Sequence, residues 1–285
     1  MSSSSPSTPP AASDYPLGHN ESELSRLILQ ARFYERQTAL LFADAGIRAG
    51  MRVLDFGCGV GDVSFLAAAL VGKEGLVVGV DRSPAAIDAA RARAAQAGRE
   101  NVRFHLADDE GLFAVPEAEP FDALVGRLVL MYQSDPTLSL RRMTARLKPR
   151  GIVAFNEVQL RGGSMAFPSS PLLTRLWTWL VSSCGAARVD LDMGFRLRRT
   201  MLEAGLVDPE VLLTARVEGG PDSPVYAYLA ETVRSLLPAI VKFGIATEAE
   251  VDIDTLADRL RAEIVASDGV LVPSMMVGAF ARWPG

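Results

Sequence analysis

The chain has 285 residues, close to the upper limit for one hydrophobic core, so its length predicts one domain with added elements. Hydrophobic residues make up 49% and charged residues 22%, a composition that excludes a largely disordered chain. The net charge of −5, with basic residues spread along the chain, argues against a nucleic-acid partner. Cys58 and Cys184 form no CxxC pair, which argues against a disulfide framework or a zinc site and favours a reducing cytoplasm.

The first residues, 1–14, are rich in serine, proline and alanine and contain no basic residue, so we expect a disordered tail rather than a secretion signal. Residues 15–47 follow, in which apolar residues from Glu21 to Ala45 recur at helical spacing behind a candidate cap, Asn20. No uncharged run reaches the roughly 20 residues of a membrane helix. We therefore expect a soluble, cytoplasmic protein.

Short apolar strands alternate with helices through the middle of the chain. The predicted strands are Arg52–Phe56, Leu76–Val80, Val102–Leu106, Phe121–Val125 and Ile152–Val158, and the predicted helices are Asp62–Val71, Pro84–Ala97 and Pro136–Leu147. This alternation predicts a doubly wound α/β domain over residues 48–160, with a parallel sheet and right-handed crossovers. The near-continuous apolar strands are typical of a sheet covered on both faces.

The alternation ends after Leu160. A loop is predicted at Arg161–Ser170, helices at Pro171–Cys184, Leu191–Ala204, Val225–Phe243 and Ile253–Ala266, and strands at Val211–Val217 and Pro273–Arg282. Residues 161–285 are therefore expected to form a helical cap over a substrate, with two late strands that complete the sheet.

The run VLDFGCGVG, from Val53 to Gly61, carries the strongest functional signal. It places Gly57, Gly59 and Gly61 between a strand and a helix, where glycines let the backbone approach a ligand at the helix N-terminus. Asp55 precedes these glycines, and Asp81 ends the next strand, where a carboxylate accepts hydrogen bonds from ribose hydroxyls. A nicotinamide-binding loop would have a third glycine at the position of Asp62, so the dinucleotide interpretation is disfavoured.

These motifs, in this order, resemble those of class I S-adenosylmethionine-dependent methyltransferases, which implies a Rossmann-like, mostly parallel seven-stranded sheet. The resemblance covers about residues 15–157. It implies that Asp81, with Arg82 beside it, binds the ribose and that Asp108 and Asp109 contact the adenine. Asp55, the three glycines and Arg127 complete the implied cofactor site.

The opening from Tyr15 to Leu24 is similar to that of bacterial small-molecule methyltransferases of the ubiquinone-biosynthesis type, which include natural-product tailoring enzymes. This resemblance implies that Tyr15 and the first helix form a lid over the cofactor. It also implies methyl transfer from S-adenosylmethionine, leaving S-adenosylhomocysteine, to a small and largely apolar metabolite by O- or C-methylation.

Alignment and exclusion of water are enough for such a transfer unless the acceptor atom must lose a proton. The candidate bases or hydrogen-bonding groups are His19, Tyr132 and Glu157, the last because it stands at the sheet edge where α/β folds bind ligands. His105 is expected to be structural.

Aromatic and basic residues of the cap are the candidates for substrate contact, namely Trp177, Phe195, Arg196 and Tyr226. The arginines leave open a C-methyltransferase that acts on an isoprenoid diphosphate. Asp190 and Asp192 suit a helix N-terminus better than a metal, so no metal is expected. A non-catalytic protein that binds S-adenosylmethionine or only dimerises is the alternative of another class, and exposed aromatic residues favour a homodimer.

Overall fold

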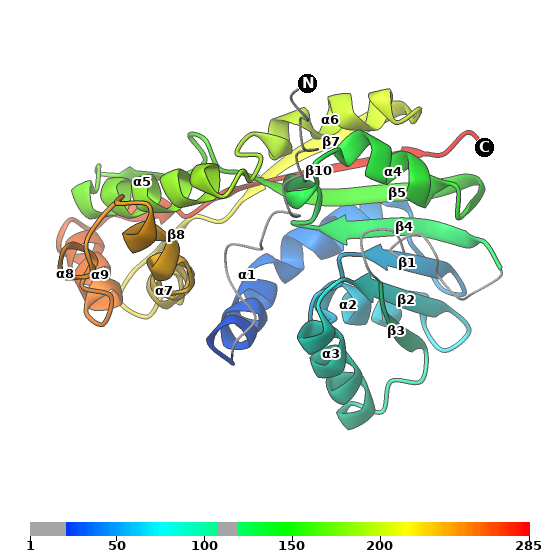
Figure 1. Ribbon diagram of the computed structural model, residues 1–285, viewed down its shortest axis with the longest axis horizontal. Helices are drawn as coiled ribbons and strands as arrows, with labels where there is room; N and C mark the ends of the chain where they lie inside the picture. Colours follow the sequence, from blue (N-terminus) through cyan, green and yellow to red (C-terminus); the bar gives the residue numbers. More distant parts are fainter. Residues whose placement is uncertain (1–20, 108–118) are drawn as a thin grey trace, which may run out of the picture.

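A seven-stranded sheet forms the centre of the protein (Figure 1). The structure is a computed structural model that describes residues 21–107 and 119–285, with side chains of the first helix from Leu29 onward. The strand order is β3-β2-β1-β4-β5-β10-β7. The strands are β1 (Arg52–Phe56), β2 (Leu76–Asp81), β3 (Val102–Leu106), β4 (Phe121–Arg127), β5 (Leu147–Gln159), β7 (Val207–Ala215) and β10 (Met275–Arg282). Strands β1 to β5 are parallel, and β10 is antiparallel to both β5 and β7. This arrangement confirms the predicted fold class.

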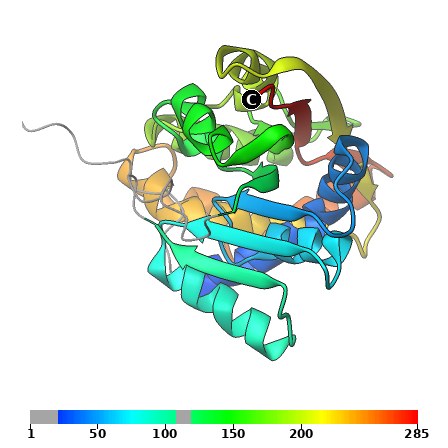
Figure 2. The same ribbon diagram turned by 90° about the vertical axis from the view of Figure 1, so that its right-hand side faces the viewer.

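Helices cover both faces of the sheet. The first face carries α1 (Glu21–Ala45), α2 (Asp62–Val71) and α3 (Pro84–Gln96), and the second carries α4 (Pro136–Thr144) and α6 (Met193–Glu203). Alternate side chains of β1 enter two separate cores, since Val53 packs with α1 and α2 whereas Leu54 packs on the other side. Helix α3 lies beside β3 at one edge, and α6 lies near β7 at the other (Figure 2).

Sequence signals explain where three of these elements begin. Ser83, Asp135 and Ser170 precede α3, α4 and α5 (Pro171–Ala186), and each side chain accepts a hydrogen bond from a backbone N–H of the first turn. A proline follows each cap, at a position where its missing N–H costs nothing.

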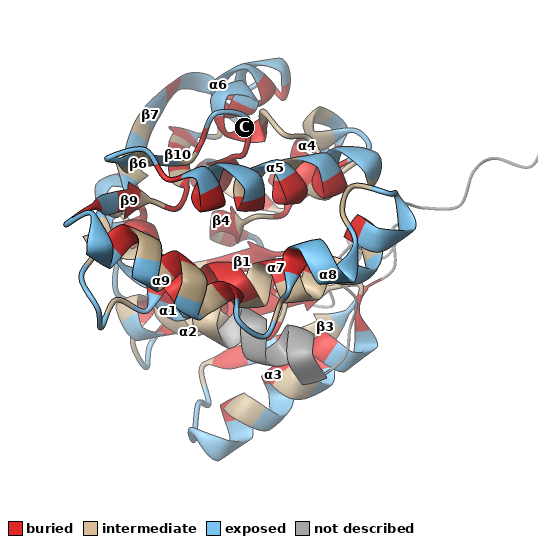
Figure 3. Ribbon diagram, turned by 90° about the vertical axis from the view of Figure 1, so that its left-hand side faces the viewer, coloured by how far each residue is buried: buried red, intermediate tan, exposed pale blue. Residues whose placement is uncertain are grey.

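The remaining elements form a cap at one end of the sheet, on the left of Figure 1. They are α5, α7 (Val225–Lys242), α8 (Glu248–Val251), α9 (Leu256–Ala266) and a small sheet of β6 (Met165–Phe167), β9 (Val270–Val272) and β8 (Glu218–Gly219). Helices α5, α7 and α9 turn buried residues toward one another and exposed residues outward (Figure 3).

Some predicted boundaries were wrong. Helix α4 ends at Thr144, and Leu147, predicted as its last residue, already belongs to β5. The pairing of β5 with β4 is irregular between Leu147 and Ile152, the segment that contains Arg150 and Gly151. The loop expected over residues 161–170 contains β6, and β9 was not predicted. Helix α6 packs on the sheet beside β5, β7 and β10 rather than within the cap.

Candidate active site

The glycine loop between β1 and α2 is held against the end of β2. The backbone N–H groups of Gly57 and Cys58 both donate to the carbonyl of Val80, at 2.9 and 3.0 Å. Gly57 has a φ of 70°, and a Cβ placed on it would lie 2.3 Å from Cγ2 of Val129. A side chain at this position is therefore excluded both by the left-handed backbone and by the loop that follows β4.

A cleft opens beside this loop and encloses about 1060 Å³ together with its mouth. Of the predicted cofactor residues, its walls include Gly57, Gly59, Asp81, Arg82 and Arg127. The carboxylate of Asp81 is fixed by two backbone donors, since Oδ2 accepts from Gly59 N and Oδ1 from Ser83 N, both at 2.9 Å. Each oxygen keeps a further lone pair for a ligand hydroxyl.

Arg127 supplies positive charge to the cleft from the end of β4. Among the described residues, its guanidinium makes one hydrogen bond, from Nη1 to Oγ1 of Thr38 at 3.2 Å. Burial lowers the pKa of Arg127, and the charges of Asp62 and Asp55 oppose that effect. A cation held in this way has spare donors for an anionic ligand group, such as the carboxylate of an amino acid.

The cleft fits the cofactor that the sequence implies. Gly59 has a φ of 53°, and a Cβ placed on it would meet nothing within 4 Å, so the loop leaves open space beside the backbone. Helix α2 begins at Asp62, and its N-cap residue Gly61 provides no side-chain cap, so N–H groups of the first turn are available to a ligand. The carboxylate of Asp81 can accept hydrogen bonds from ligand hydroxyls, and the guanidinium of Arg127 can donate to an anionic group.

Two predicted cofactor residues do not lie on the wall of this cleft. Asp55 is fully buried, and its Oδ2 accepts a hydrogen bond from Ser64 of α2 at 2.6 Å. Burial raises the pKa of Asp55 to about 7, although the Ser64 bond lowers it. Gly61, with a φ of 92°, allows close packing, because a Cβ there would lie 2.8 Å from the ring of Phe104. Both residues support the loop from behind.

A second, more apolar cavity adjoins the cleft. It encloses about 560 Å³ together with its mouth and lies among α1, α5, α7 and the ends of β4 and β5. Gln30, Leu128 and Tyr132 line both spaces, so the two ligand spaces share a wall. Trp177, which was predicted as a substrate contact, also lines this second cavity, and its Nε1 donates to the carbonyl of Leu160 at 2.9 Å.

Part of the shared wall is a strained turn after β4. Leu128 has a φ of 54°, which is unusual for a residue with a branched side chain and is found most often at functional sites. A short 3₁₀ helix, η2 (Leu130–Tyr132), follows it. The turn is held from beneath by Glu157, whose Oε1 accepts from the backbone N–H groups of Val129 and Leu130 at 3.0 and 2.8 Å.

Glu157 is therefore not the substrate-facing base that we expected. Its side chain is fully buried and lines neither space, because β5 is covered on both faces at this point. Burial raises the pKa of Glu157 to about 7, and the backbone donors lower it in part. It is a positioning residue for the turn that carries Tyr132.

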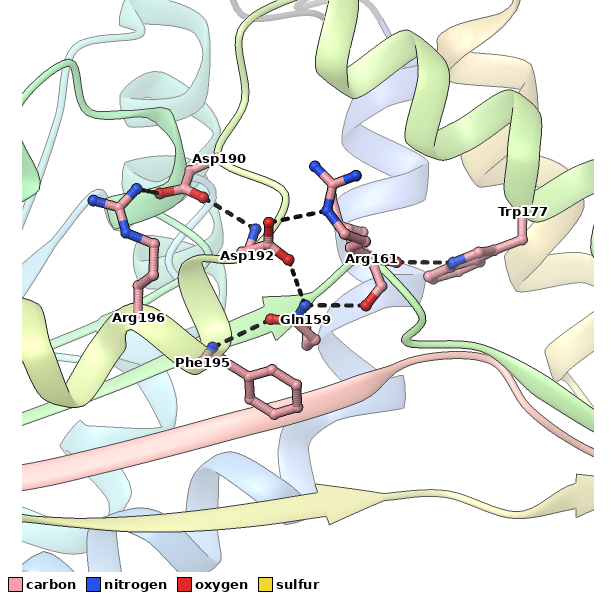
Figure 4. A network of polar contacts seen from close by, with 8 residues as sticks. Gln159, Arg161, Trp177, Asp190, Asp192, Phe195 and Arg196 are labelled. Carbon is pink, nitrogen blue, oxygen red and sulfur yellow. Dashed lines mark hydrogen bonds and ion pairs between the residues drawn. The ribbon is translucent and has the colours of Figure 1, made fainter.

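Three of the predicted substrate contacts lie away from the cavity. Phe195 is 64% exposed on the outer side of α6, and Arg196 forms an ion pair with Asp190 (Figure 4). Tyr226 is fully buried, and its hydroxyl donates to the carbonyl of Gly220 at 3.0 Å. Helix α6 places Met193, Leu197 and Met201 inward, which turns position 195 outward.

The predicted capping role of Asp190 and Asp192 was also partly wrong. Asp192 is the N-cap residue of α6, but its side chain makes no capping bond. Instead it accepts from Nε2 of Gln159 at 2.8 Å and from Nε of Arg161 at 3.0 Å (Figure 4). Asp190 accepts from the backbone N–H of Asp192 at 3.0 Å. The network fastens the end of β5 to α6.

Four predicted site residues, Tyr15, His19, Asp108 and Asp109, lie outside the described residues, as do the expected tail and the start of the expected lid. Within residues 21–107 and 119–285, no group of three His, Cys, Asp or Glu residues is placed to hold a metal ion. In the same ranges, no helix is long and apolar enough to cross a membrane.

Several residues of the second cavity were not predicted from the sequence, among them Gln30, Tyr34, Thr232 and Ser274. They come from α1, α7 and the segment before β10, which meet only in the folded chain. The helical period of α1 and α7 was a usable signal for which positions turn inward, but not for what they face.

Comparison with known proteins finds a matching family over part of the chain. Residues 47–176 match the family described as a methyltransferase domain. Aklanonic acid methyltransferase DauC of Streptomyces sp. (strain C5) is 35% identical over 120 residues, which are 41% of this chain and 53% of that protein. The 2-phytyl-1,4-naphtoquinone methyltransferase of Synechococcus elongatus is 34% identical over 144 residues, which are 49% of this chain and 58% of that protein.

The matched segments thus span little more than half the length of these two relatives. The fold itself extends further, since the crystal structure of the YcgJ protein of Bacillus subtilis resembles 88% of this chain and 99% of its own, with a TM-score of 0.58 and 17% identity.

Proposed function

We propose that this chain, whose Rossmann-like domain is a class I S-adenosylmethionine-dependent methyltransferase domain, methylates a small, largely apolar metabolite on oxygen or carbon. The observation that carries the proposal is the wall of Gln30, Leu128 and Tyr132 shared by the two spaces. The first space carries more polar surface and suits the cofactor, and the other is lined mainly by apolar and aromatic side chains. An acceptor in the second space would therefore meet the cofactor across this wall.

In the cofactor cleft, the chain's own groups bind and orient. Asp81 accepts the ribose hydroxyls, the open backbone at Gly59 allows close approach, and Arg127 binds the carboxylate of the methionine moiety. Asp108 and Asp109 are proposed adenine contacts by resemblance alone. When bound, S-adenosylmethionine supplies an electrophilic methyl group on its sulfonium.

The rate enhancement we propose comes from alignment and exclusion of water. Tyr132, a predicted catalytic residue, lines both spaces, and we expect its phenol to orient an acceptor. Glu157 fixes the turn beneath it. Holding two reactants in line contributes about 7–11 kcal/mol in well-oriented systems. A separate strong base is needed only if the acceptor atom carries a tightly held proton.

The isoprenoid diphosphate alternative gains no support from the cap. A diphosphate needs clustered cations, yet no Lys or Arg lines the second cavity among the described residues. Arg161 and Arg196 bind Asp192 and Asp190 at the surface instead.

The proposal is tested with S-adenosylmethionine carrying an isotopically labelled methyl group. The full chain is incubated with hydroxylated naphthalenes and naphthoquinones, in parallel with protein and RNA fractions. The proposal expects label in the organic extract, with a mass gain of one methylene on a named acceptor. Label that appears only in protein or RNA, or none above a heat-denatured control, would contradict it. Trp177→Ala is expected to reduce transfer, whereas Phe195→Ala, a change at the exposed surface, is expected to leave it unchanged.

A further inference from the structure

Three hydroxyl groups meet on the wall of the second cavity. The Tyr34 hydroxyl lies 3.0 Å from that of Tyr228 and 2.5 Å from Oγ of Ser274. All three residues line the cavity, and their side chains are largely shielded, with exposures of 2%, 5% and 5%. They come from α1, α7 and the segment that precedes β10, so the cluster exists only because the cap and the first helix pack together.

The three hydroxyl groups of this cluster cannot satisfy all of their own hydrogen-bond donors. Each hydroxyl offers one donor and two acceptor positions. Two bonds join the three groups, so two of the three protons are used, and one O–H is left without an acceptor whichever way the protons are arranged. The hydroxyls have no other partner among the described residues. A shielded donor without an acceptor is unfavourable, and a ligand oxygen would satisfy it.

The two tyrosine rings of the cluster are packed against each other and against Phe33. The ring of Tyr228 stacks on that of Phe33 at 4.5 Å and 10°, and the guanidinium of Arg216 lies 4.5 Å from the centre of the same Phe33 ring. Tyr34 meets both rings edge-on, at 5.3 and 5.9 Å. Hydroxyls held in place by packed rings bind a ligand oxygen without further ordering, which favours affinity and selectivity.

The rest of the cavity indicates what carries that oxygen. Leu160, Leu180 and Leu236 provide apolar surface, and Trp177 and Tyr132 add aromatic groups. Among the described residues, no Lys, Arg, Asp or Glu lines this space. A charged ligand would lose hydration here with no counter-ion on the cavity wall, since Arg127, whose charge is felt at Tyr34, lines the adjoining cleft.

We propose that Tyr34, Tyr228 and Ser274 form an oxygen-binding subsite that selects acceptors with an uncharged aromatic body and a hydroxyl or carbonyl group. The subsite names the substrate class of the reaction proposed above and rests on it. The pKa of Tyr34 is raised well above its ordinary value, first by burial, so its phenol stays protonated at neutral pH and remains a donor.

The test compares two probes of nearly the same shape, 1-naphthol and 1-methylnaphthalene, by titration calorimetry on the full chain with and without S-adenosylhomocysteine. One hydrogen bond made in a shielded site predicts about tenfold tighter binding of 1-naphthol by the wild type. The triple variant Tyr34→Phe, Tyr228→Phe, Ser274→Ala keeps the aromatic rings and removes all three hydroxyls. Its preference is expected to fall below about twofold.

Tyr226→Phe is the matched control, because it also removes a tyrosine hydroxyl from α7. The Tyr226 hydroxyl donates to the carbonyl of Gly220, and Tyr226 does not line the cavity. Its preference for 1-naphthol is expected to equal that of the wild type, and thermal unfolding checks that each variant is folded. A wild-type preference below twofold, or an unchanged preference in the triple variant, overturns the subsite. The two proposals can fail separately. If the wild type does not bind S-adenosylhomocysteine, the methyltransferase reaction is contradicted, while the preference for 1-naphthol still tests the subsite.

Discussion

Replacement of Glu157 by glutamine separates a positioning role from a catalytic one. The Oε1 atom of Glu157 accepts two backbone N–H groups of the turn after β4, and its Oε2 is buried without a partner. A glutamine oxygen can accept the same two bonds, so Glu157→Gln is expected to keep the turn, the cofactor affinity and the activity. Glu157→Ala removes the acceptor and is expected to lose all three.

The pH dependence of stability gives the magnitude. Burial raises the pKa of Glu157 from 4.5 in the unfolded chain to about 7 in the folded protein, so the folded state binds the proton more tightly. The stabilisation is complete below the unfolded pKa and is lost as pH rises through the folded one. Linkage predicts a loss of about 2 kcal/mol between about pH 5.5 and about pH 8.5 from this group.

Urea unfolding at several pH values measures this loss in the wild type and in Glu157→Gln. The pKa of Asp55 is also raised to about 7 by burial, but that contribution is common to both proteins and cancels in the difference. The variant is expected to show a pH dependence shallower by about 2 kcal/mol over the same range. Parallel profiles would refute the raised pKa, and loss of activity in a folded Glu157→Gln would refute the positioning role.

Three further outcomes are expected at the cofactor cleft. Gly59→Ala and Gly98→Ala each place a Cβ on a left-handed backbone, at φ values of 53° and 59°, with nothing within 4 Å, so both variants should lose about 1–2 kcal/mol of stability. Only Gly59→Ala should also weaken S-adenosylhomocysteine binding in calorimetry. Equal affinities of the two variants would contradict the loop assignment. Arg127→Met should weaken S-adenosylhomocysteine by about 10- to 100-fold and leave methylthioadenosine, which has no carboxylate, unaffected; equal losses for both ligands would point to a structural effect. Activity should survive EDTA, and a loss restored by magnesium would show a metal requirement.

The central domain was predictable because each of its signals is local. Strands β1 to β5 are apolar runs separated by helices of ordinary length, and the glycine loop and Asp81 occur at fixed points of that pattern. Parallel pairing then brings the ends of these strands to one edge of the sheet. The chemistry of the cofactor cleft therefore follows from residue order.

The second cavity was not predictable in the same way. Tyr226 and Tyr228 are two positions apart on α7, so the helical period turns them in nearly opposite directions. The packing of α7 against α1 decides that Tyr228, and not Tyr226, faces the cavity. Phe195 had the right chemistry for a substrate contact but lies opposite the inward stripe of α6. Strands as short as β8 and β9 carry too few residues for a periodic signal.

Titration calorimetry with S-adenosylhomocysteine in the presence of EDTA tests the central claim most directly, using the wild type, Asp81→Ala and Asp88→Ala. Asp81 is fixed toward the cleft by Gly59 and Ser83, whereas the side chain of Asp88 is 76% exposed on α3. We expect micromolar binding by the wild type and by Asp88→Ala, and a loss of at least about 100-fold in a folded Asp81→Ala, since two charge-assisted hydrogen bonds disappear. Wild-type affinity in Asp81→Ala, or no binding by the wild type, would contradict the cofactor site described here.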